Sequence, residues 1–194
     1  MRMTFAFVSD DQALDFVGTV GRRRSEPVEL LSTPEDLARW LAESGAVDNA
    51  VQVGRLDLEL ALQLREAIYR LAIDCTDGTP HRETDVDLIN RVSALGQVRR
   101  VLHADGSIER SGDAAAALST VAASAIDLVG GHHRALIREC SASDCTRLYV
   151  DTSSRGTRRW CSMQLCGNRA KAAKFRSRGS KSGTQLTDSA SNHR

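Results

Sequence analysis

Four of the five cysteines in this 194-residue chain lie close together near its C-terminal end. They are Cys140, Cys145, Cys161 and Cys166, and they form the pattern C-x4-C-x15-C-x4-C. Two short cysteine knuckles separated by about fifteen residues are typical of a tetrahedral zinc site. Because four thiolates fill the coordination shell, no position remains for a water or a substrate. The sequence therefore predicts one structural Zn²⁺ rather than a hydrolytic metal.

The segment that contains the cysteines is basic, whereas the rest of the chain is acidic. Residues 134–181 hold 12 Lys and Arg against 3 Asp and Glu, and residues 1–133 hold 13 against 21. Lysine and arginine can neutralise phosphates, and arginine and asparagine can also contact base edges. The candidate nucleic-acid contacts are Arg155, Arg158, Arg159, Asn168, Arg169, Lys171, Lys174, Arg176 and Arg178.

The order of residues around the cysteines predicts a small zinc finger similar to a treble clef. A strand is expected at 147–151, a returning hairpin strand at 158–160, and a helix from 169 to about 178. Asn168 would cap that helix. The finger has few apolar residues, so metal binding is expected to supply much of its folding free energy. These apolar residues are Leu148, Val150, Trp160, Met163, Leu165 and Phe175.

The preceding residues predict a mostly helical body with one small sheet. Thr33 and Pro34 are a strong helix start, and Thr84 is the expected cap of a later helix. Asp105-Gly106 predicts a β-hairpin. Four helices are expected in this body. The first begins after Thr33 and ends at Gly45, and the others lie at 56–75, 84–95 and 113–129. The fold class is therefore α+β, with a helical domain at 1–133, the zinc finger at 134–178 and a flexible tail at 179–194.

Composition limits the classes of function. No apolar run is long enough to cross a membrane, and Asp10 and Asp11 interrupt the N-terminal segment before a signal sequence could form. We therefore expect a cytoplasmic protein without a membrane partner. The histidines show no spacing to an acid or a nucleophile that indicates a mechanism, so no catalytic residue and no enzymatic activity are expected.

The run RRWCSMQLCGNRAK, together with both knuckles and the YVD strand, resembles the CGNR zinc-finger family. Upstream, ALDFVGTV, the helix that begins at Thr33-Pro34 and the later LREA run resemble the ABATE domain that usually precedes this finger. The family's pattern commonly has asparagine where Gly18 stands. The resemblance, from about Leu14 to Arg178, implies a bacterial, stress-induced transcription regulator with a DNA-binding finger.

Three functions stay open at this stage. The favoured hypothesis is a DNA-binding transcriptional regulator whose body senses a small-molecule effector, forms a homodimer or contacts the transcription machinery. An RNA-binding zinc-ribbon protein and a protein-interaction adaptor are the alternatives. Spacing alone does not distinguish DNA from RNA, and it indicates no target sequence, effector, oligomeric state or direction of regulation.

Overall fold

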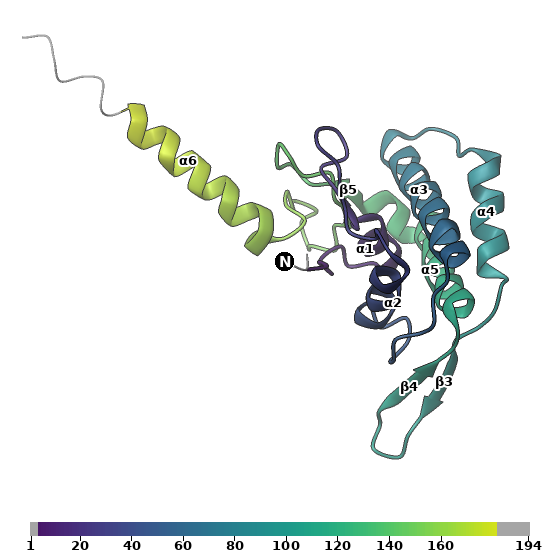
Figure 1. The fold of residues 1–194 in the computed structure, drawn as a ribbon. Helices are drawn as coiled ribbons and strands as arrows, with labels where there is room; N and C mark the ends of the chain where they lie inside the picture. The colour runs from purple at the N-terminus through teal and green to yellow at the C-terminus, as the bar shows by residue number, and fades with distance from the viewer. Residues whose placement is uncertain (1–3, 182–194) are drawn as a thin grey trace, which may run out of the picture.

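The computed structural model describes residues 4–181, except the side chains of residues 174, 175 and 177–181. About half of this part of the chain is helical, and three antiparallel pairs of short strands accompany the helices. Figure 1 shows the helices packed in one body, from which α6 (Asn168–Lys181) extends away. The expected tail at 179–194 is only partly described, because 179–181 continue α6 and 182–194 lie outside the described residues.

The helices and strands divide between a body and a C-terminal part of the chain. The body contains α1 Gln12–Val17, β1 Val20–Gly21, β2 Val28–Glu29, α2 Pro34–Glu43, α3 Arg55–Asp77, α4 Glu83–Ser93, β3 Arg99–Leu102, β4 Ile108–Ser111 and α5 Ala114–Gly130. The C-terminal part contains the 3₁₀ helix η1 His132–Leu136, β5 Ile137–Glu139, β6 Leu148–Val150, the π-helical turn η2 Met163–Gly167 and α6.

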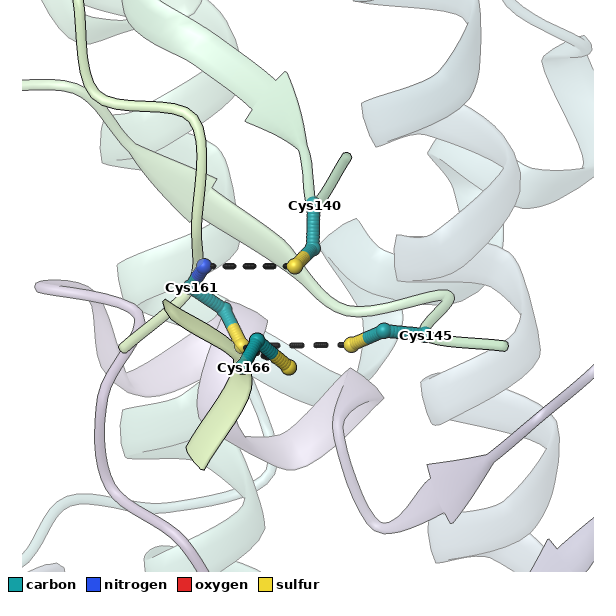
Figure 2. Close-up of side chains that lie close together, drawn as sticks. All are labelled: Cys140, Cys145, Cys161 and Cys166. Carbon is teal, nitrogen blue, oxygen red and sulfur yellow. Dashed lines mark hydrogen bonds between the residues drawn. The ribbon is translucent and has the colours of Figure 1, made fainter. Parts of the chain in front are cut away.

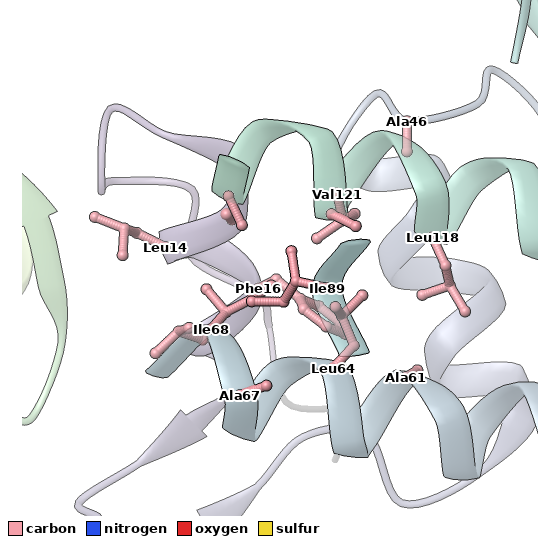
Figure 3. Packing of buried hydrophobic residues seen from close by; sticks show 14 of the residues in the cluster. Leu14, Phe16, Ala46, Ala61, Leu64, Ala67, Ile68, Ile89, Leu118 and Val121 are labelled. Atoms are coloured by element: carbon pink, nitrogen blue, oxygen red, sulfur yellow. The ribbon is translucent and has the colours of Figure 1, made fainter. Parts of the chain in front are cut away.

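The core of the body lies where α1, α3, α4 and α5 meet. Figure 3 shows Phe16, Leu64, Ile68, Ile89 and Val121 pointing toward one another from these helices, and all are buried. The apolar stripe of α3 recurs every three or four residues, which places it on one helix face. The mostly helical body expected from the sequence is confirmed.

Local start signals explain the helix boundaries, with one correction. Thr33 caps α2 as predicted, and its hydroxyl accepts from the amide of Asp36 at 3.2 Å. In contrast, α4 begins at Glu83 after Arg82, so Thr84 lies inside the helix and the prediction that it is the cap was wrong. Helix α4 therefore starts without a side-chain cap.

The predicted hairpin at Asp105-Gly106 is present and extends away from the body (Figure 1). Gly106 has a φ of 84°, a conformation that glycine adopts without a Cβ penalty. Leu102 pairs with Ile108 near the turn, and both side chains are exposed. Among the described helices, none has the length and apolar character needed to cross a bilayer.

An ion pair that fastens α4 to α3 gives a pH-dependent prediction. The Arg70 guanidinium donates to both carboxylate oxygens of buried Asp85, at 2.7 and 2.6 Å, and lowers the pKa of that carboxyl below its ordinary value of 3.8. This stabilisation is present above the unfolded-state pKa and is lost as pH falls through the folded-state pKa. We expect Asp85→Asn to lower the free energy of unfolding by about 1–3 kcal/mol at pH 7. In urea titrations this difference should shrink below pH 3.8; a pH-independent difference would contradict this assignment.

Candidate metal centre and nucleic-acid interface

The four cysteines converge on one point, as Figure 2 shows, and their sulfurs all lie within 4.8 Å of one another. The Cys145 Sγ–Cys161 Sγ distance is 3.8 Å and the Cys161 Sγ–Cys166 Sγ distance is 3.6 Å. A tetrahedron with Zn–S bonds of about 2.3 Å has edges of about 3.8 Å. Disulfides would require about 2.05 Å, and all the cysteines are free. The donor set therefore fits one structural zinc ion.

Crowding of the sulfurs favours the thiolate form of one cysteine and disfavours that of its neighbours. Hydrogen bonds from the thiols of Cys145 and Cys161 hold the pKa of Cys140 well below its ordinary value of 9.0. The same hydrogen bonding to Cys140 raises the pKa of Cys145 to about 12, and it raises the pKa of Cys161 as well. Ionisation of Cys140 thus disfavours ionisation of Cys145 and Cys161. A divalent cation at the centre of the four sulfurs would favour the thiolate form of all four cysteines.

Donors around the sulfurs orient the ligands. The Cys161 amide donates to Cys140 Sγ at 3.4 Å, and Arg169 Nη2 donates to Cys166 Sγ at 3.6 Å. The same Arg169 nitrogen pairs with Asp144 Oδ1 at 3.0 Å, which ties the second knuckle to the first. Such contacts fix ligand orientation and favour the thiolate. Arg169 was predicted as a nucleic-acid contact, and the structure also gives it this role beside the metal centre.

The strand arrangement of the finger differs from the expected one. β6 pairs with β5, with Ile137 opposite Val150 and Glu139 opposite Leu148, and it does not pair with residues 158–160. The first knuckle is therefore the turn of this hairpin, and the predicted return strand at 158–160 was wrong. Asp151 explains the irregular connection, because its carboxylate accepts from the amides of Ser153 and Arg158 at 3.1 Å each.

The hairpin belongs to the core of the body. Ile137, Leu148 and Val150 are buried in the same cluster as α1, α3 and α5. The few apolar residues of the finger are therefore supplemented by the core of the body, in addition to the metal binding that the sequence predicts. Trp160 is half-buried against the cysteines, Met163 and Leu165 are 48% and 45% exposed, and the side chain of Phe175 lies outside the described residues.

Arg158 occupies an internal position between the finger and the N-terminal segment. Its guanidinium donates to the carbonyl oxygens of Val8 at 2.7 Å and Trp160 at 3.0 Å, and also to that of Cys161. It forms an ion pair with Asp10 and stacks over the Tyr149 ring, with 4.3 Å to the ring centroid. This placement favours a structural role, and the nucleic-acid contact expected of Arg158 stays a prediction. Sequence reasoning missed Asp10, because 148 residues separate it from its partner.

A second contact joins the first knuckle to α1. Arg147 Nη1 is buried without a hydrogen-bond partner in the described part of the chain, and it lies beside Gly18 at the end of α1. A Cβ on Gly18 would stand only 2.6 Å from this nitrogen. Glycine at position 18 therefore leaves room for the arginine.

The helix that carries most of the predicted contacts begins earlier than expected. The π-helical turn η2 leads directly into α6, and Ser162 caps η2, because its hydroxyl accepts from the amides of Gln164 and Leu165 at 3.1 and 3.3 Å. Asn168 has helical φ and ψ of −68° and −37°, so the prediction that it is the cap was wrong. The side chain of Asn168 is exposed and does not cap the helix. Gly167 allows close packing here, since a Cβ would lie 3.2 Å from Trp160 Cδ1.

The remaining predicted contacts divide between a loop and α6. Arg155 is exposed in the loop after β6, and exposed Arg159 stacks on Trp160 at 5.3 Å from the ring centroid. Lys171 and Arg176 are exposed on α6. Lys174 and Arg178 also belong to α6, but their side chains lie outside the described residues. We define the exposed basic surface of the finger as Arg155, Arg159, Lys171 and Arg176.

Comparison with protein families agrees with this site. Residues 10–132 match the ABATE family, described as "Putative stress-induced transcription regulator", and residues 137–179 match the CGNR zinc finger. The chain therefore belongs to the ABATE family and ends in a CGNR zinc finger, and its four cysteines hold one structural Zn²⁺. No curated protein matches the chain.

Proposed function

We propose that this chain is a DNA-binding transcriptional regulator whose zinc finger contacts the phosphates of a duplex. Helix α6 is the observation that carries the proposal. It contains six Lys and Arg and no acidic residue, and Figure 1 shows it extending from the body. Only Gly167 separates its first residue from the zinc ligand Cys166, so the metal centre fixes the base of the helix.

Electrostatics explains why α6 suits a polyanion. A helix of 14 residues is marginal in water by itself, and like charges three or four positions apart destabilise it further. Lys171 and Lys174 are one such pair of positions. Phosphates along a duplex would neutralise these charges, and their binding would release condensed counterions. The acidic body would stay away from the duplex, which orients the finger toward it.

The test is a fluorescence-anisotropy titration with a labelled mixed-sequence DNA duplex. We expect Lys171→Ala/Arg176→Ala to weaken binding on the order of tenfold and to reduce the slope of log K against log salt by about 2, since each phosphate contact contributes about 0.9. The matched control is Arg55→Ala/Arg91→Ala, which removes two exposed arginines from the body. Equal losses in the two double variants, or no loss in either, would contradict the proposal.

A binding site for single-stranded RNA is the second candidate, and a cavity beside Trp160 favours it. This cavity of about 490 Å³ is lined in part by Arg159, Trp160 and Met163, where an unpaired base could stack. Competition between unlabelled duplex DNA and single-stranded RNA for the labelled duplex separates the two candidates. Under the DNA proposal the duplex competes at the lower concentration. Failure of all nucleic acids to bind at low salt would favour the protein-interaction adaptor.

A further inference from the structure

A groove on the side of α5 lies outside the finger and has no part in the proposed function. Its volume is about 850 Å³, within the range of small-molecule sites. Four parts of the body meet there, namely the start of α1, the end of α4 with the following loop, β3 and the length of α5 through η1. Convergence of several elements on one polar concavity is typical of a ligand site.

The hydroxyl groups that line the groove can serve a ligand mainly as acceptors. Ser93 donates to the Asn90 carbonyl at 2.8 Å, and Ser119 donates to the Ser93 carbonyl at 2.7 Å. Thr120 donates to the Ala116 carbonyl at 3.2 Å. Each hydroxyl has one proton, so these three groups retain only lone pairs for a ligand.

Two carboxylates add to this acceptor surface. Asp11 and Asp127 both line the groove, and Ser124 links their positions. The Ser124 hydroxyl contacts both Asp11 carboxylate oxygens at 3.4 Å, and Asp127 follows it by three residues on the same face of α5. Burial raises the pKa of Asp11. A cation beside this carboxylate would compensate for the water that it has lost.

Gln12 Nε2, next to Asp11, already donates to Ser44, and the other side-chain donors of the groove are Gln97, Arg100 and the two histidines. Gln97 and Arg100 line the groove near the first half of α5, while Asp127 lies about 10 Å further along that helix from Thr120 at the usual rise per residue. His132 and His133 border the same end as Asp127, and a neutral imidazole can accept as well as donate. We propose that this groove binds a small molecule that carries a primary or secondary amine, held as its ammonium by Asp11 and Asp127.

Isothermal titration of the full-length, zinc-loaded chain tests this proposal without any nucleic acid. The probes are 1,4-diaminobutane and lysine, with pentanoate as an anion of similar length. We expect saturable one-to-one binding of at least one amine and none of pentanoate. Asp127→Asn should weaken the binding at least about tenfold, as loss of a charge-assisted hydrogen bond does.

Two further variants complete the design. Ala123 is exposed on the wall of the groove, so Ala123→Phe should abolish amine binding by filling it, and Ala123→Leu serves if the larger residue prevents folding. Asp87→Asn removes an exposed carboxylate from α4 away from the groove and should leave the affinity unchanged. Binding of pentanoate alone, no saturable heat with any probe, or an amine affinity that Asp127→Asn or the Ala123 variant leaves unchanged would overturn the proposal.

Discussion

Replacement of Cys161 by serine should release the zinc ion and destabilise the body together with the finger. Cys161 is fully buried, and its sulfur lies 3.8 Å from Cys145 Sγ and 3.6 Å from Cys166 Sγ. Structural zinc contributes folding free energy directly, about 10–16 kcal/mol in isolated finger peptides. Here the first knuckle is the turn between β5 and β6, whose apolar residues belong to the main core. We therefore expect a loss of more than about 4 kcal/mol and a decrease in Tm of about 10 °C.

Metal analysis and thermal unfolding of the same samples measure this effect. Cys75→Ser is the matched control, because Cys75 is half-buried at the end of α3, away from the metal centre. It should retain one zinc per chain and a Tm within a few degrees of the parent protein. A Cys161→Ser variant that still holds one zinc per chain, or that unfolds at the parent temperature, would show that these sulfurs do not bind a structural ion.

Arg158→Ala should have the second largest effect on stability. The substitution leaves the carbonyl oxygens of Val8, Trp160 and Cys161 without this donor and leaves Asp10 without its ion-pair partner. Loss of a charged donor from partly buried acceptors costs about 2–4 kcal/mol in total, which corresponds to about 5–10 °C in Tm. Arg158→Lys should restore little, because one ammonium cannot replace the planar fork of the guanidinium.

The neighbouring residue provides the control for this prediction. Arg159 is exposed and its guanidinium stacks on the Trp160 ring, so Arg159→Ala should change the free energy of unfolding by less than about 1 kcal/mol. In the folded proteins, Arg159→Ala should weaken DNA binding more than Arg158→Ala does. If Arg158→Ala and Arg159→Ala were equally stable, the structural role of Arg158 would be refuted.

Features with a local cause could be predicted from the sequence. The zinc ligands follow from the spacing of four cysteines, and the start of α2 follows from Thr33 and Pro34, whose capping acts within one helical turn. Asp105-Gly106 similarly specifies the hairpin turn by itself. The cap and the turn each involve residues that are neighbours in the chain, and the four zinc ligands are recognised from their residue type and spacing without knowledge of the fold.

Features that depend on distant partners could not be predicted. The pairing of β6 was predicted wrongly because its partner β5 precedes the first knuckle and its burial depends on helices far away in sequence. Arg158 and Arg159 are adjacent residues of the same type. Only the fold brings Asp10 and the Val8 carbonyl to Arg158. A basic run therefore does not distinguish an internal guanidinium from an exposed one. The groove along α5 likewise has no sequence signal, because its four contributing segments meet only in the folded body.

The affinity of zinc-loaded and zinc-depleted protein for one DNA duplex, measured across a series of salt concentrations, tests the central claim most directly. Only Gly167 separates Cys166 from α6, so loss of the ion should disorganise the base of the helix and the basic surface that it presents. We predict that zinc-loaded protein binds with a steep linear decrease of log K against log salt, about −0.9 for each phosphate contact. Zinc-depleted protein should bind at least about a hundredfold more weakly and regain affinity when zinc is restored. Equal affinities and equal salt dependences for the two forms would contradict the account.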